Sequence, residues 1–97
     1  MPQIVFSPAA FCDLERLRDF LRTKNPLAAR RAGKAILDGT KILGTHPRVG
    51  RPIEGLPEQY REWMIDFGDS GYVVYCRVDS VVTVLAIRHQ REAGYVN

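Results

Sequence analysis

The chain has 97 residues, of which 45% are hydrophobic and 26% charged, and this predicts a single globular domain over 1–97. Its formal net charge of +3 favours acidic partners without requiring nucleic acid. No window reaches transmembrane length and the first residues lack the features of a signal peptide, so we expect a cytoplasmic protein with no membrane partner. Cys12 and Cys76 lie far apart without metal-ligand spacing, and we expect both to stay reduced.

The first half of the chain predicts one strand and two helices. Gln3 to Phe6 is a short apolar run that can form a strand. Ser7-Pro8 marks the start of a helix over 9–24, whose inward positions are Ala10, Leu14, Leu17 and Leu21. Asn25-Pro26 repeats this punctuation before a second helix over 27–44, with inward positions Ala29, Ala32, Ile36, Gly39 and Leu43. The very short link predicts a helical hairpin that covers one face of a sheet.

The second half predicts a three-stranded antiparallel meander over 61–90. Strand-forming runs alternate with a four-residue turn at Gly68 to Gly71 and a two-residue turn at Asp79-Ser80. With those turns, one face of the sheet is nearly pure hydrocarbon and carries Trp63, Ile65, Phe67, Tyr72, Val74, Cys76, Val78, Val81, Thr83, Leu85 and Ile87. The proline-rich and glycine-rich segment before the meander, residues 45–60, is expected to be irregular.

The opposite face of the meander is expected to be half apolar. It carries Met64, Val73, Tyr75, Val82, Val84 and Ala86 among several charged residues. The same register places Glu62 across from Arg77, an ion pair beside this apolar group. A patch of this kind favours a binding surface, although the tail or the first strand is an alternative cover. The predicted fold is therefore α+β, in the order β-α-α-β-β-β.

Few residues point to catalysis. The chain has no phosphate-binding glycine loop, no nucleophile elbow, and no carboxylate pair at acid/base spacing. Two histidines, His46 and His89, cannot build a metal site by themselves, so we expect no metal and no cofactor. His89 stands between Arg88 and Gln90, where it is either a general acid or base, a phosphate ligand, or simply a half-exposed residue at a strand end.

The order of these elements, together with five short motifs, resembles the RelE/ParE superfamily of bacterial type II toxin–antitoxin toxins. The motifs are S-P-A-A-F-x-D-L at 7–14, G-R-P-I-E-G-L at 50–56, Y-R-E at 60–62, G-Y-V-V-Y at 71–75 and R-H-Q-R-E-A-G-Y at 88–95. Each motif is weak alone, whereas their order and spacing are specific. The resemblance covers essentially the whole chain and is closest to the ParE branch.

The two branches of the superfamily imply different targets. A RelE-like protein would be a metal-independent endoribonuclease that cuts messenger RNA on the ribosome, whereas a ParE-like protein would inhibit DNA gyrase without being an enzyme. The chain departs from the nuclease pattern, with Gly71-Tyr72 where an arginine often precedes the middle strand and with Tyr95 displaced from Arg91. Arg61 and Arg77 also fall on opposite sheet faces. The sequence therefore favours gyrase inhibition, with the endoribonuclease and a non-toxic binding module as alternatives.

The resemblance also implies a partner, a ParD-like antitoxin with an acidic C-terminal region, in a hetero-oligomer with the toxin. We expect no direct DNA binding by the toxin alone. The expected antitoxin-binding residues lie on the hairpin and on the half-apolar sheet face: Phe11, Arg18, Phe20, Arg22, Arg30, Met64 and Tyr75. The expected target-binding residues lie at the end of the last strand and in the tail: Arg88, His89, Arg91 and Tyr95.

Overall fold

The two helices begin at the two polar residues that precede proline. In the computed structural model, which describes residues 3–91, α1 spans Pro8–Arg22 and α2 spans Pro26–Thr45. The Ser7 hydroxyl accepts a hydrogen bond from a first-turn amide of α1, and the Asn25 side chain accepts two from α2. These caps satisfy amides that have no partner within the helix, so both predicted helix starts are confirmed.

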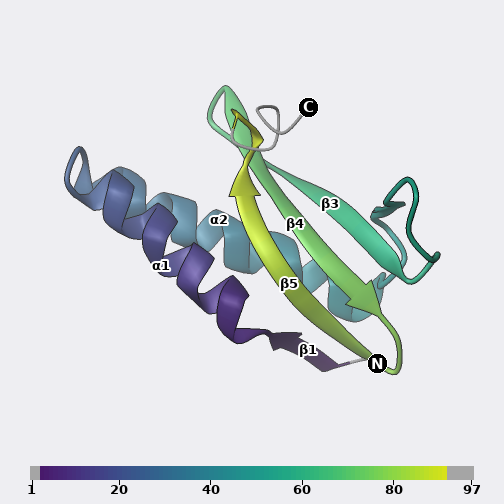
Figure 1. The fold of residues 1–97 in the computed structure, drawn as a ribbon. Helices are drawn as coiled ribbons and strands as arrows, with labels where there is room; N and C mark the ends of the chain where they lie inside the picture. The colour runs from purple at the N-terminus through teal and green to yellow at the C-terminus, as the bar shows by residue number, and fades with distance from the viewer. Residues whose placement is uncertain (1–2, 92–97) are drawn as a thin grey trace.

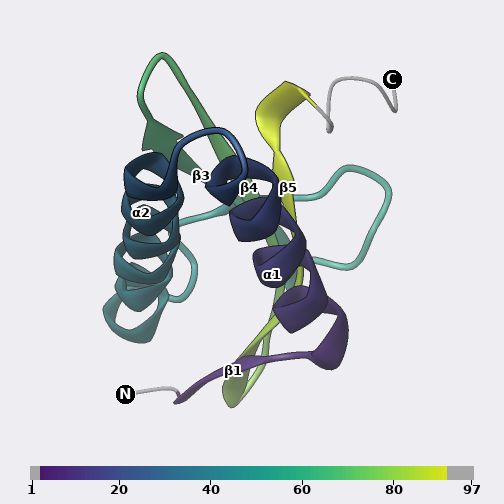
Figure 2. The same cartoon turned by 90° about the vertical axis from the view of Figure 1, so that its left-hand side faces the viewer.

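Five strands form one sheet, and both helices cover the same face of it (Figures 1 and 2). The strands are β1 (Gln3–Phe6), β2 (Arg51–Pro52), β3 (Tyr60–Phe67), β4 (Ser70–Val78) and β5 (Val81–His89). Their order is β1-β5-β4-β3-β2, with β1 parallel to β5 and every other pair antiparallel. The predicted α+β fold is confirmed. The short β2 is an addition, because the segment before β3 was expected to be irregular; its proline stands in an edge strand, where a missing N–H is tolerated.

The core lies between the hairpin and the sheet. Its largest fully buried side chains are Ile36, Leu43, Val74, Cys76, Val82, Val84 and Ile87. Trp63 packs against both halves of this core, and its indole N–H donates to the Gly39 carbonyl of α2 at 3.1 Å. A Cβ at Gly39 would lie 2.6 Å from the Ile65 Cδ1 atom, so α2 needs a glycine where it crosses β3.

The register between β3 and β4 differs by two residues from the predicted one. Phe67 pairs with Ser70 and Trp63 with Val74, so the turn contains only Gly68 and Asp69. Gly68 adopts a φ of +62°, which suits a tight turn. Because the shift is even, every side chain on these strands keeps its predicted face.

The predicted faces are wrong for the first half of β5. Val78 pairs with Val82, which leaves three residues in the turn and brings Val82 and Val84 into the core in place of Val81 and Thr83. A bulge follows, where Tyr75 pairs with Ala86 and Cys76 with Val84. The extra residue returns Ile87 to the core, as predicted. The three-residue turn therefore reverses which side chains of β5 face the core, and the bulge then restores the predicted alternation.

The outer sheet face consequently differs from its expected composition. Glu62 faces Tyr75 across the strands and binds the Arg51 Nε atom at 2.5 Å, whereas Arg77 faces Tyr60. The predicted pair of Glu62 with Arg77 is therefore wrong. Val82 and Val84 leave this face for the core, and Val81 and Thr83 take their places on it, while Met64 stays exposed there.

We expect Trp63→Ala to lower the free energy of unfolding by about 3 kcal/mol, because it removes a large side chain that joins both halves of the core. Trp63→Phe, which keeps much of the packing but loses the bond to Gly39, should cost about 1 kcal/mol. Urea unfolding followed by far-ultraviolet circular dichroism measures the stability of both variants. Tryptophan fluorescence would not serve, because both substitutions remove Trp63, the only tryptophan. An alanine variant as stable as the wild type would contradict this packing.

Candidate functional site

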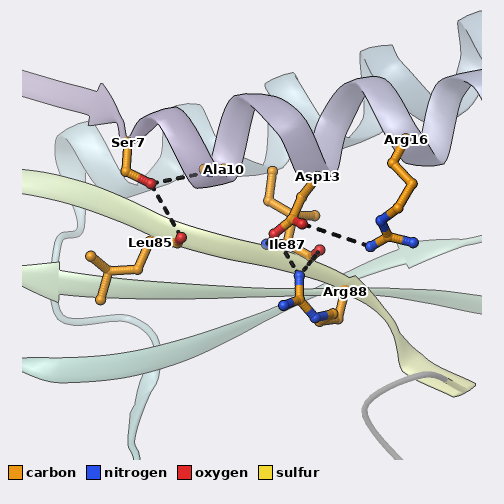
Figure 3. Close-up of polar contacts among 7 residues, drawn as sticks. All are labelled: Ser7, Ala10, Asp13, Arg16, Leu85, Ile87 and Arg88. Atoms are coloured by element: carbon orange, nitrogen blue, oxygen red, sulfur yellow. Dashed lines mark hydrogen bonds and ion pairs between the residues drawn. The ribbon is translucent and has the colours of Figure 1, made fainter.

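Beyond residue 84, where β1 no longer pairs with β5, side chains of Ser7 and α1 bind the edge of β5 (Figure 3). β1 pairs with β5 only over residues 81–84, after which the chain turns into α1. From there the Ser7 hydroxyl donates to the Leu85 carbonyl at 3.2 Å, and Asp13 Oδ2 accepts from the Ile87 amide at 2.9 Å. The helix thus supplies the hydrogen bonds that a longer β1 would have made.

Arg88 is held in the same cluster. Its Nη1 atom lies 2.5 Å from Asp13 Oδ2 and donates to the Ile87 carbonyl at 3.2 Å, while Arg16 approaches the second oxygen of Asp13 at 3.8 Å. The side chain of Asp13 is only 15% exposed. Arg88 retains 42% side-chain exposure and projects from the end of β5 in a fixed orientation.

His89 has hydrogen bonds at both ring nitrogens. Nδ1 accepts from the Arg91 amide at 3.1 Å, which assigns the proton to Nε2, and Nε2 lies 3.2 Å from the Ser70 hydroxyl. The ring also stands edge-on to Tyr72, with centroids 5.4 Å apart. His89 and Arg91 line a cavity of about 460 Å³ with Phe20. Tyr95, the fourth expected target-binding residue, lies outside the described residues.

Arg61, one of the two arginines expected on opposite sheet faces, is buried beneath the loop before β3. Its Nη1 atom donates to the carbonyls of Gly50 at 2.8 Å and Arg48 at 3.3 Å. Arg77 lies on the opposite face, with its Nε atom 2.9 Å from Asp79. The predicted separation of Arg61 from Arg77 is therefore confirmed, and Arg61 anchors the loop.

A groove of about 720 Å³ runs between the two helices and the end of β1. Its floor and walls are mostly apolar: Ile4, Phe6, Leu14, Gly33, Leu37 and Thr40. Its rim is charged: Arg18, Arg30, Lys34, Asp38 and Lys41. Leu37 is 44% exposed and contributes apolar surface to the groove.

The rim of the groove is positively charged. Lys34 and Lys41 both approach Asp38, at 2.5 Å and 3.8 Å. The hydrogen bond from Lys34 is the main reason that the pKa of Asp38 lies below its ordinary value, and the charges of both lysines act in the same direction. The groove lining therefore contains four cationic side chains and one carboxylate, which favours an acidic ligand.

The residues expected to bind an antitoxin fall in four places. Arg18 and Arg30 line the groove, and together with Arg22 they also line a smaller neighbouring cavity of about 440 Å³. Phe20 belongs to the His89 cavity, with Lys24 above its ring. Phe11 is exposed beside Phe6, and Met64 and Tyr75 lie on the outer sheet face.

Several groove residues were not anticipated from the sequence. Gly33, Leu37 and Lys41 follow one another at intervals of four along α2, so they share one side of the helix. That four-residue spacing, with the large apolar Leu37 in the middle, is the sequence feature that indicates a second, groove-lining side of α2. The sequence analysis missed it because, apart from Arg30, it assigned only the inward-facing residues of α2.

Neither a metal centre nor a membrane segment emerges from the part of the chain that is described. Within residues 3–91, the acidic, histidine and cysteine side chains form no group of three that could hold a metal ion. Among the helices of that same range, neither is long and apolar enough to cross a membrane.

Comparison with known proteins identifies the family. The family model described as the ParE toxin of type II toxin–antitoxin systems, parDE, matches residues 4–94. The chain belongs to this family. Toxin RelE3 of Caulobacter vibrioides is 36% identical over 93 residues, which cover 95% of this chain and 98% of that protein. A solved structure described as the chromosomal ParDE system from P. aeruginosa shares the fold, with a TM-score of 0.74 at 22% identity over 92% of this chain and 96% of that one.

The predicted resemblance to RelE/ParE toxins is thus confirmed. The chain is a toxin of a type II toxin–antitoxin system, and membership of such a family implies a cognate antitoxin as partner. The names of the relatives include both ParE and RelE, which are the two branches that the sequence left as alternatives.

We expect Asp13→Ala to lower the free energy of unfolding by about 1–3 kcal/mol, because it leaves the buried Ile87 amide and the Arg88 guanidinium without their acceptor. Asp13→Asn keeps an oxygen for the amide and should cost less. Asp19→Ala, which removes an exposed partner of Arg22 on the same helix, serves as the control and should change little. Equal stability of the Asp13→Ala and Asp19→Ala proteins in urea would contradict the role of Asp13.

Proposed function

We propose that this toxin inhibits DNA gyrase by binding to it, and that it does not cleave RNA. The observation that carries the proposal is the dispersal of the candidate catalytic groups among the described residues. A metal-independent ribonuclease needs a base, an acid and a cationic clamp that converge on one phosphate. Here Arg61 is buried under a loop, Arg77 lies on the opposite sheet face, and Arg88 is paired with Asp13.

His89 offers little support for acid/base catalysis. Its Nδ1 lone pair receives the Arg91 amide, and its protonated Nε2 points to the Ser70 hydroxyl. A general base requires an unprotonated nitrogen within reach of the substrate proton. In this arrangement the ring orders the end of β5, where it packs on Tyr72.

The proposed target-binding surface is the end of β5 with the tail that follows it: Arg88, His89, Arg91 and Tyr95. Arg88 and Arg91 would contribute positive charge, and Arg88 would be pre-oriented by its bond to Asp13. A side chain that is already held in place loses less conformational entropy on binding. The cavity beside His89 adds apolar contact area through Phe20, Phe67 and Tyr72.

For the antitoxin we propose a different principal site. The groove between α1 and α2 combines an apolar floor with a cationic rim, which suits an amphipathic acidic segment. Met64 and Tyr75, on the outer sheet face, would be a secondary contact for an extended part of the same segment. In this assignment the antitoxin and gyrase use different surfaces.

The second candidate function is ribosome-dependent cleavage of messenger RNA. It rests on the name of the Caulobacter vibrioides relative, Toxin RelE3. If the tail brought Tyr95 to His89 and Arg88 on the ribosome, these groups would supply an acid, a base and a clamp. The two functions make opposite predictions in purified systems.

We expect the purified toxin to inhibit DNA supercoiling by gyrase and to leave messenger RNA intact on translating ribosomes. A variant that ends at Gln90 should lose the inhibition, because it lacks Arg91 and Tyr95, but should still bind the antitoxin encoded beside the toxin gene. Retained antitoxin binding shows that the truncated protein is folded. Cleavage of ribosome-bound messenger RNA by the intact toxin, with gyrase unaffected, would establish the second function instead.

A further inference from the structure

The cavity of about 460 Å³ beside the end of β5 lies where the described part of the chain ends. Its walls come from α1, from the turn between β3 and β4, and from the end of β5, and they include four rings: Phe20, Phe67, Tyr72 and His89. Arg91 also lines the cavity, and it is the residue from which the tail, residues 92–97, continues. The tail therefore starts at the wall of the cavity.

The rings that line the cavity have room for a further ring. The centroids of Phe67 and Tyr72 lie 5.9 Å apart, and those of Tyr72 and His89 lie 5.4 Å apart. Lys24 lies over the ring of Phe20, yet Phe20 remains 62% exposed. Aromatic rings attract one another in tilted or edge-on arrangements with centroids about 4.5–7 Å apart. The lining therefore favours an aromatic side chain as the occupant.

The tail contains one such side chain at a suitable distance. Tyr95 is the only aromatic residue among residues 92–97, and it follows Arg91 by four positions. Four positions span about 6 Å in a helix and at most about 14 Å in an extended chain. Gly94 comes directly before Tyr95 and allows the backbone to turn back toward the cavity. Tyr95 can therefore reach the cavity in either conformation.

The tail has an advantage over any occupant that comes from another molecule. A side chain tethered so close to the cavity wall has an effective concentration on the order of millimolar, whereas a separate protein binds from dilute solution. The polar part of the lining also suits a phenol, because Asp69, Ser70 and Arg91 offer hydrogen-bonding partners to its hydroxyl group. Both features favour the tail tyrosine.

We propose that Tyr95 docks its ring into this cavity, against Phe20, and so fixes the tail of the toxin to the end of β5. Tyr95 is then a positioning residue. Its ring fills the hollow beside Arg91, so that Phe20, Arg91 and Tyr95 form one continuous surface. The benefit for gyrase binding rests on the proposed function, because an ordered tail loses less conformational entropy when the target binds. The docking itself requires no target.

Nuclear Overhauser effects in the intact, isotope-labelled toxin test the docking in the absence of gyrase. We expect cross-peaks between the ring protons of Tyr95 and those of Phe20 and His89. Tyr95→Phe should keep these contacts, whereas Tyr95→Ala should shift the ring signals of Phe20 and His89, because it removes a neighbouring ring. Val96→Ala is the matched control in the same tail and should leave those signals unchanged.

Two results of this experiment would overturn the docking. One is the absence of cross-peaks from Tyr95 to Phe20 and His89. The other is a set of cross-peaks from Tyr95 to Met64 and Val73, which would place the tail on the outer face of the sheet instead.

Inhibition of supercoiling then separates the docking from the proposed function. Tyr95→Ala and Phe20→Ala should each inhibit gyrase roughly tenfold less well, whereas Tyr95→Phe should stay within about twofold of the wild type. If the cross-peaks are present but Tyr95→Ala inhibits normally, the docking stands and the proposed role of the tail in gyrase binding is wrong. If the cross-peaks are absent while the wild type inhibits gyrase, the proposed function stands and the docking is wrong.

Discussion

The hydrogen bonds that join Ser7 and α1 to the edge of β5 are the constraint on which both proposed binding surfaces depend. A four-residue β1 pairs with only the first part of β5 and leaves later backbone groups of that strand without a ladder partner. The Ser7 hydroxyl donates to the Leu85 carbonyl and the Asp13 carboxylate accepts from the Ile87 amide, in place of a partner strand. These two hydrogen bonds fix α1 along the edge of β5. A buried backbone amide without a partner is costly, and this makes Asp13 important despite its place in a charged helix.

Both candidate surfaces follow from that constraint. On one side, the carboxylate that accepts from Ile87 also orients Arg88, at the end of the strand that leads into the tail. On the other side, the position of α1 determines the distance between Leu14 and α2, and therefore the width of the groove. Arg18 and Arg30 give this groove a positive rim. The same helix thus shapes a proposed antitoxin site and supports a proposed target site.

Sequence reasoning predicted the features that depend on local chemistry. The caps at Ser7 and Asn25, the inward stripe of α1 and the order of the elements are all encoded within a few neighbouring residues. It failed at Val82 and Val84, where a three-residue turn and a later bulge move the pattern by one residue each. No distinctive residue marks the turn or the bulge in the sequence, because the pairing of β4 with β5 decides where both occur. Asp13 was missed for a related reason: its role depends on a strand that lies far away in the chain.

The most direct test of two separate surfaces is to map the antitoxin on the toxin by nuclear magnetic resonance. Isotope-labelled toxin would be titrated with the antitoxin encoded beside its gene, and shifts of the backbone amide signals would be followed. The largest changes should fall at Leu14, Arg18, Gly33 and Leu37, with small changes from Ile87 to Arg91. If the largest changes fall at the end of β5 while the groove residues stay unaffected, the two surfaces have been assigned the wrong way round.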